Sequence, residues 1–282
     1  MPPAIIKLLL AAARLPLPWL FLHDAFVPAG WIGLASLILV RPALRGLGGI
    51  ALLVAACTTA IAIAFHWSPE AMAYAVDSSW WFGLGISCVL FLIDGARLAA
   101  PIWIAGWLCK SPYGLWFAGG VVAVDVEGMY QSVFPWRLGH FQLHWPLLAQ
   151  SADLFGAGML TLLAYAFAGV IANGWLAWGE SRGSAAQSEG IPSRERFTRL
   201  APVAVCLFAV FYGWWSIDRW SRIAAENPRL RVAVVQVYPG HNLSVGIAQQ
   251  LTSYTAKEAD LVCWPESIGG TYAMQLEDLA DR

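Results

Sequence analysis

The residues best suited to catalysis lie near the end of the sequence, in the stretch DLVCWPESIGG at 260–270. An apolar run ends there on Trp264-Pro265-Glu266 and opens into a Ser/Gly-rich turn. In an α/β sheet, a carboxylate just past the C-terminal end of a strand lies where such folds place their sites. An apolar setting beside Trp264 and Pro265 would suit Glu266 to general-base catalysis. From residue types alone, a surface or helix-capping glutamate is an equally good interpretation of Glu266.

Two further pairs of polar residues have spacings that could serve chemistry. His140 and His144 are four residues apart, as in a helical metal pair. Proline and glycine residues surround them and no third ligand is evident, so we expect ordinary interfacial histidines and neither a metal nor a cofactor. Asp94 and Arg97 lie three apart, which predicts a local ion pair near the cytoplasmic end of a helix. An intramembrane site is the alternative, because charges within membrane spans are often functional.

The cysteines do not indicate a metal or disulfide framework. None of the five lies in a CxxC motif, and four of them lie in apolar runs: Cys57, Cys88, Cys109 and Cys206. They are predicted to be small buried hydrophobic residues. Cys263 follows Leu261 and Val262 inside an expected strand, so we interpret it as a core residue rather than a nucleophile.

The elements that must position these residues follow from a very apolar composition. Of 282 residues, 59% are hydrophobic and 12% are charged, whereas a soluble domain carries about 25% charged residues. So few charges cannot cover the surface of a water-soluble protein of this length, and a lipid bilayer is the expected solvent. The sixteen Trp agree with this, since indole rings favour the membrane interface. The formal net charge of −1 gives no indication of nucleic-acid binding.

Apolar stretches of about 20 residues, the length that crosses a bilayer, predict seven transmembrane helices within a membrane domain at 1–217. They lie near 4–22, 25–40, 47–65, 80–98, 100–123, 153–177 and 200–217. The first is expected to be an uncleaved membrane helix. Its Lys7 and Arg14 lie inside the apolar stretch, whereas a signal peptide carries its charge in front.

The distribution of arginine predicts the orientation of these helices, because Lys and Arg in short loops favour the cytoplasm. Arginines follow the second, fourth and sixth spans. The segment 179–199, which follows the sixth span, is also Ser/Gly-rich and is predicted to be a flexible connector. The loop at 66–79 has no Lys or Arg, and the loop at 124–152 has only Arg137. This pattern predicts a cytoplasmic N-terminus and a periplasmic segment after residue 217.

Residues 218–282 are more polar and predict the start of an α/β domain. The run LRVAVVQV at 230–237 is typical of a buried strand, and DLVCW at 260–264 of a second one. Between them, apolar residues three and four apart predict a helix over 243–259. Strand–helix–strand units normally pair their strands in parallel, with a right-handed crossover.

The succession RVAVVQV, a helix and KEADLVCWPES resembles the opening of the carbon–nitrogen hydrolase (nitrilase) superfamily, in which a strand of the type gaDLVVWPE carries a catalytic Glu. Joined to a multi-span membrane domain, it resembles the apolipoprotein N-acyltransferases of bacterial inner membranes. A second stretch, 127–172, is similar to that family's E…FPW…LG…Q…P…A…GxxG segment, which leads into a membrane helix. The two matches together cover roughly the C-terminal half of the chain.

This resemblance implies a four-layer α-β-β-α sandwich, begun by residues 218–282, and a Glu–Lys–Cys triad. The Cys thiolate would attack an acyl ester of a membrane phospholipid, and the thioester would pass its acyl chain to the N-terminal amine of a diacylated lipoprotein. Glu266 matches the catalytic Glu. Glu127 matches a family Glu at the outer end of the fifth span, as a lining of the lipid entrance or as an interfacial cap. The Lys and Cys have no match, since neither residue type follows Glu266.

Two other functions stay open at this stage. The nitrilase-like conjugal-transfer protein TraB of plasmids has the same membrane-plus-hydrolase layout, and a decayed, non-catalytic paralogue would keep the scaffold without the chemistry. Residues 230–282 supply only the first strands and helices of a sandwich, too little chain to bury a core of its own. We therefore expect the chain to be a truncated or fragmentary acyltransferase that is inactive by itself.

Overall fold

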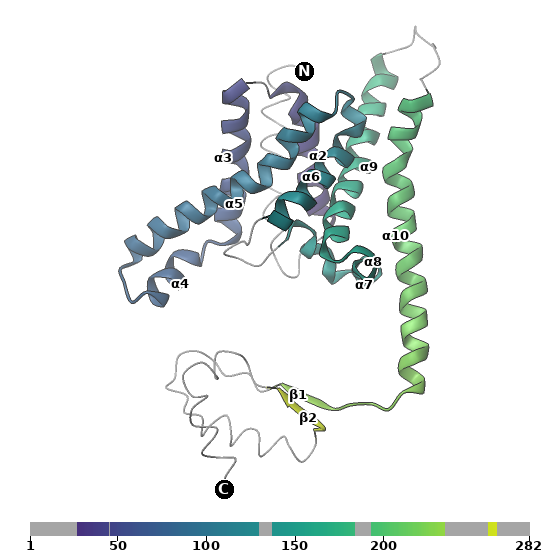
Figure 1. Ribbon diagram of the computed structural model, residues 1–282. Helices are drawn as coiled ribbons and strands as arrows, with labels where there is room; N and C mark the ends of the chain where they lie inside the picture. The colour runs from purple at the N-terminus through teal and green to yellow at the C-terminus, as the bar shows by residue number, and fades with distance from the viewer. Residues whose placement is uncertain (1–26, 45, 130–136, 184–192, 235–258, 264–282) are drawn as a thin grey trace. The chain divides into compact units, whose positions relative to one another are not determined.

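The computed structural model describes residues 27–44, 46–129, 137–183, 193–234 and 259–263. The chain forms two compact units, residues 1–218 and residues 219–282, and each is described by itself. The first unit is a bundle of helices, and the second contains a pair of strands (Figure 1). The nitrilase-type sandwich stays a prediction, because this small sheet is the only part of it among the described residues.

The helical unit is built from long helices joined by short helical turns. Its first described elements are α2 (Val27–Val40), η2 (Arg41–Ala43), α3 (Gly46–Ala64), α4 (Ser68–Ala75) and α5 (Trp80–Leu108). They are followed by η3 (Pro112–Gly114), α6 (Leu115–Met129), η4 (Leu138–His144), α7 (Pro146–Ala149), α8 (Ala152–Phe155), α9 (Ala157–Gly183) and α10 (Ser193–Glu226).

Four of the described helices are long and apolar enough to cross a membrane: Gly46–Ala64, Trp80–Leu108, Ala157–Glu180 and Arg196–Glu226. The apolar stretch Val27–Ala43 and helix α6 are shorter. The first predicted span, at 4–22, lies outside the described residues. The four long helices agree with the membrane protein that the composition predicts, whereas the total of seven spans stays a prediction.

The largest departure from the predicted spans is α5. The sequence predicts a break between residues 98 and 100, but one helix of 29 residues runs through that point with Pro101 inside it. Proline removes one backbone hydrogen bond, and packed membrane helices tolerate this loss because their neighbours satisfy the freed carbonyl. The helix begins after Ser79, whose hydroxyl accepts the N–H of Phe82. The turn between the fourth and fifth predicted spans therefore lies at 109–114.

The predicted connector at 179–199 is also partly helical. Helix α9 continues to Gly183 and α10 already begins at Ser193. The predicted seventh span, 200–217, accordingly forms only the middle of α10. The apolar stretch marks where a helix can contact lipid, but Glu and Arg are themselves good helix formers and extend the helix beyond it.

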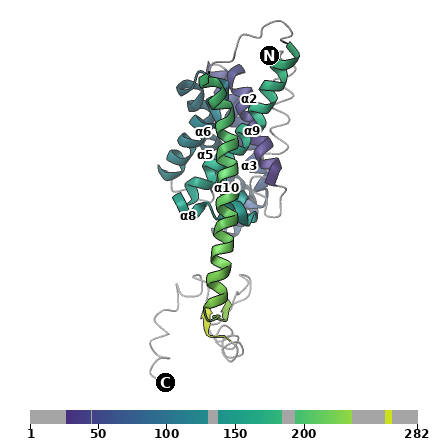
Figure 2. The same ribbon diagram turned by 90° about the vertical axis from the view of Figure 1, so that its right-hand side faces the viewer.

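Helix α9 lies at the centre of the helical unit. It contacts α2, α6 and η4, while α5 contacts α3, α4 and α6. The fully buried residues of α9 include Leu160, Thr161, Leu163, Ala164, Tyr165, Ala166, Ala168 and Ala172. Helix α10 lies on the outside of the bundle beside α9 (Figure 1 and Figure 2). Small residues allow the close approaches, since a Cβ on Gly95 of α5 would overlap Thr58 of α3.

The second unit contains β1 (Val232–Val234) and β2 (Leu261–Cys263). The two strands are parallel, with Val232 opposite Leu261 and Val234 opposite Cys263. This confirms the predicted parallel pairing, and the described strands begin one or two residues after their predicted starts at 230 and 260. The helix predicted over 243–259 lies outside the described residues except for its last position.

Candidate functional site

The edge where β1 and β2 end is the first part of the candidate site. Parallel strands bring their C-terminal ends to the same edge, where α/β folds place functional residues. The predicted catalytic residue, Glu266, comes three residues after Cys263 ends β2, and it lies outside the described residues, as does Lys257. Cys263 itself is half-buried within the strand, where it pairs with Val234. The role of Glu266 stays a prediction.

An Arg–Asp pair fixes the beginning of the two strands. The backbone N–H of Arg231 donates to Oδ2 of Asp260 at 2.8 Å, and the Asp260 N–H donates back to the Arg231 carbonyl at 2.8 Å. The hydrogen bond from the Arg231 backbone N–H to the Asp260 carboxylate holds the pKa of Asp260 below its ordinary value. The hydrogen bond from the Arg231 guanidinium has a smaller effect in the same direction. Sequence reasoning missed the pair. The sequence contained a signal for it: Arg231 and Asp260 each directly precede a predicted strand, and Val232 lies opposite Leu261 in the sheet, so the two charged residues come side by side.

Glu127 connects three elements of the helical unit. It is buried near the end of α6, and its Oε1 accepts the backbone N–H of Leu138, the first residue of η4, at 2.7 Å. Its Oε2 accepts the hydroxyl of Thr161 on α9, also at 2.7 Å. These contacts favour the interpretation of Glu127 as a cap rather than as the lining of a lipid entrance.

Asp94 and Arg97 form the predicted ion pair, with 3.6 Å between Oδ1 and Nη1. Their side chains are only 8% and 7% exposed. The prediction of their position was wrong, because α5 continues to Leu108 and the pair therefore lies near the middle of the helix. Ionisable residues at such depth are costly and usually face the interior of a bundle, and burial here agrees with that rule.

Polar groups of neighbouring helices lie close to this pair. Arg97, Glu127 and Tyr165 line one small cavity of about 10 Å³, which α5, α6, α9 and the start of η4 enclose. The hydroxyls of Tyr165 and Thr58 are buried, and neither has a hydrogen-bond partner among the residues that the structure describes. A volume of this size is about the minimum that holds one water molecule, and buried water commonly satisfies buried polar groups.

The two histidines are not placed as a helical metal pair. They lie in the 3₁₀ helix η4, where residues three apart share a face and residues four apart do not. Nδ1 of His140 accepts the backbone N–H of Arg137 at 3.2 Å. Burial lowers the pKa of His140, and the charge of Arg137 adds to the shift. Within the described ranges, no group of three or more His, Cys, Asp or Glu side chains could hold a metal ion.

An apolar cavity of about 620 Å³ lies between α6, α9 and α10. Its lining comes from these helices and the end of α8: Val121, Val124, Asp125, Phe155, Gly158, Met159, Leu162, Ala204, Val205 and Phe208. Its walls match the chemistry of a lipid acyl chain, and the volume falls within the range of about 300–1,000 Å³ for ligand sites. Sequence reasoning did not identify this cavity, because its lining residues, apart from the exposed Asp125, are ordinary apolar or small residues from three distant segments.

Comparison with known proteins adds no identification. No protein-family model matches the sequence, and no curated protein matches it.

Proposed function

We propose that this chain is the membrane domain and the opening of the hydrolase domain of an apolipoprotein N-acyltransferase. The observation that carries the proposal is the parallel pairing of β1 and β2, with Trp264-Pro265-Glu266 directly after β2 in the sequence. That succession is the one by which the chain resembles carbon–nitrogen hydrolases. Four long apolar helices on the same chain support a substrate that resides in a membrane.

In the proposed reaction, Glu266 accepts the proton of a cysteine thiol, and the thiolate attacks the ester carbonyl of a phospholipid. The ester C–O bond breaks, and the lysophospholipid leaves as an alcohol that takes up this proton. The amine of a diacylated lipoprotein then attacks the thioester, the C–S bond breaks, and the amine's proton passes to the carboxylate and on to the released thiolate. Neither Lys nor Cys follows Glu266 in this sequence, so the proposal assigns Glu266 alone among the triad.

The helical unit would supply the acyl donor from the bilayer. The cavity between α6, α9 and α10 is apolar except for the exposed Asp125, which suits it to hold an acyl chain of the phospholipid. The arginine distribution supports an orientation in the bacterial inner membrane with residues after α10 on the periplasmic side. That is the side on which a lipoprotein acceptor would be exposed.

The test is the N-acylation rate of the complete reading frame that contains codons 1–282, measured with phospholipid and a diacylated lipopeptide. Glu266→Gln keeps the size of the side chain but removes the proton acceptor, so the rate should fall by about 10²–10⁴-fold. Glu277→Gln makes the same chemical change outside the motif and should leave the rate unchanged. A Glu266→Gln protein that keeps a near wild-type rate at matched expression would contradict the proposed role. Absence of any acylation by the wild type would contradict the acyltransferase itself.

A further inference from the structure

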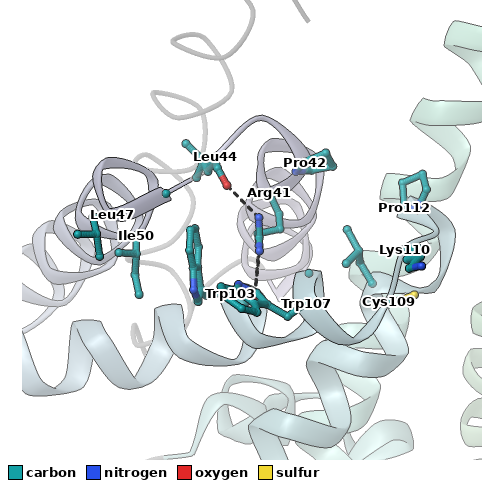
Figure 3. Close-up of a pocket in the computed structure, with 13 residues that line it drawn as sticks. Arg41, Pro42, Leu44, Leu47, Ile50, Trp103, Trp107, Cys109, Lys110 and Pro112 are labelled. Carbon is teal, nitrogen blue, oxygen red and sulfur yellow. Dashed lines mark hydrogen bonds between the residues drawn. The ribbon is translucent and has the colours of Figure 1, made fainter.

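A second cavity, of about 720 Å³, lies at the end of the helical unit where α3 begins and α5 ends (Figure 3). Its walls come from η2, the first turn of α3, the last turns of α5 and the turn before α6. Most of its lining is apolar and includes Leu47, Ile50 and Trp107. It shares no lining residue with the cavity between α6, α9 and α10, so the proposed acyl donor site does not explain it.

A buried arginine gives this apolar cavity a positive charge. Arg41 is only 8% exposed, and its guanidinium lies 4.3 Å from the centre of the Trp103 ring. Its Nη1 donates to the Leu44 carbonyl at 2.9 Å, and its Nε and Nη2 donate to the Trp103 carbonyl at 3.3 and 3.1 Å. Carbonyls orient the guanidinium but do not neutralise it. Among the described residues, no carboxylate forms an ion pair with Arg41.

The backbone of α5 is shaped to receive this side chain. A Cβ on Gly106 would overlap the guanidinium of Arg41, so glycine at this position lets the charge lie against the helix. A buried charge without a counterion is costly, and the cost is reduced when an anion enters the cavity.

A second cation lies on the rim of the same cavity. Lys110 is exposed in the turn that follows α5, and none of the described residues that line the cavity is acidic. In the orientation proposed above, the segments that carry Arg41 and Lys110 both lie on the cytoplasmic side, since α3 and α5 separate them by two crossings. The cytoplasmic leaflet carries anionic lipids, and basic pockets between membrane helices on that side suit their headgroups.

We propose that this cavity binds an anionic phospholipid of the cytoplasmic leaflet. The phosphate lies between Arg41 and Lys110, and the adjoining parts of the acyl chains lie against Leu47, Ile50 and Trp107. The indole rings at the end of α5 match the depth of the headgroups, where tryptophan is enriched. The site is a fixed lipid contact, separate from the chemistry proposed for Glu266.

The proposal is tested by native mass spectrometry of the purified chain in detergent, titrated with phosphatidylglycerol and with phosphatidylcholine. The wild type should bind the anionic phosphatidylglycerol more tightly than phosphatidylcholine, which has no net charge. Lys110→Gln should weaken that binding roughly five-fold, the effect of about 1 kcal/mol for one cation near a headgroup. Arg41→Gln should weaken it at least as much. Gly106→Ala should also weaken it, because it displaces the guanidinium without changing the net charge.

The matched control is Arg229→Gln, which removes one positive charge from an exposed position outside the cavity. It should bind phosphatidylglycerol like the wild type. Lys110 is exposed, so the Lys110→Gln variant should fold as the wild type does. Equal affinities of Arg229→Gln and Lys110→Gln for phosphatidylglycerol would therefore overturn the proposal. Inorganic phosphate alone should not raise the thermal unfolding temperature. If inorganic phosphate raised the unfolding temperature as much as phosphatidylglycerol does, the site would be one for a soluble anion, and the proposed lipid site would be wrong.

Discussion

Glu127 illustrates how much one buried carboxylate contributes to the helical unit. It accepts two hydrogen bonds from partners that come 11 and 34 residues later in the chain. Without it, the N–H of Leu138 and the hydroxyl of Thr161 would lose their acceptor in a buried setting. An unsatisfied buried donor costs about 1–3 kcal/mol.

Glu127→Ala should therefore lower the free energy of unfolding by at least about 1–3 kcal/mol, visible as a lower thermal unfolding temperature in detergent. Glu127→Gln keeps an acceptor for Leu138 and a partner for the Thr161 hydroxyl, so its loss should be smaller. Asp125→Ala removes an exposed carboxylate two residues earlier on the same helix and serves as the control. The order Asp125→Ala, Glu127→Gln, Glu127→Ala, from least to most destabilised, is expected; any other order contradicts the capping role.

At the scale of single residues, the sequence predicts contacts between residues close together in the chain and misses contacts between residues far apart in it. Asp94 and Arg97 lie three apart, so helical geometry alone brings them together. Arg41 and the Trp103 carbonyl are separated by 62 residues, and no spacing in the sequence shows that contact. Glu127 could be recognised as a candidate by its motif, but its partners depend on how α6, η4 and α9 pack.

At the scale of elements, the outer helix α10 is attached to the bundle at a few defined points. Ser216 donates to Oε1 of Gln150 at 3.1 Å and is also 3.3 Å from Oδ2 of Asp153. One turn earlier, α10 approaches α7 so closely that a Cβ on Gly213 would overlap the carbonyl of Leu147.

Gly213→Ala should therefore push α10 away from α7 and cost about 1–3 kcal/mol, the range of overpacking in a close contact. Gly174→Ala makes the same change on α9 at a position where no atom lies near the added methyl group. In a helix that change should be neutral or stabilising by about 0.5–1 kcal/mol. Thermal unfolding of both variants in the same detergent measures the difference. Equal unfolding temperatures would show that α10 is not held at this contact.

The positions of helices were easier to predict from the sequence than their ends. Apolar stretches predicted the locations of α3, α9 and α10, because lipid requires a continuous apolar surface. The ends depend on caps and turns. The break expected before Pro101 is absent, and the actual end of α5 lies near Pro112, where the preceding residue is extended as proline requires.

At the scale of the whole molecule, the orientation that the arginines predict stays a prediction, and fusions to reporter enzymes test it. Arg97 lies inside α5, so Lys110 is the basic residue in the turn between α5 and α6. In the predicted orientation this turn and the segment 184–192 are cytoplasmic. Alkaline phosphatase, which is active only in the periplasm, should therefore be inactive when fused at Ser188 and active when fused at Asn242. A green fluorescent fusion should give the reverse. Phosphatase activity at Ser188 would contradict the orientation.

The two ends of α5 carry exposed tryptophans, Trp80 and Trp81 at the first turn and Trp107 at the last. Twenty-six residues separate Trp81 from Trp107, about 39 Å along the axis at about 1.5 Å per residue. A bilayer with its headgroups is about 40–45 Å thick. In a thinner membrane, α5 would tilt or the surrounding lipid would thicken, at fractions of a kcal/mol per Å of mismatch. Membrane thickness would thereby set the depth of Asp94 and Arg97.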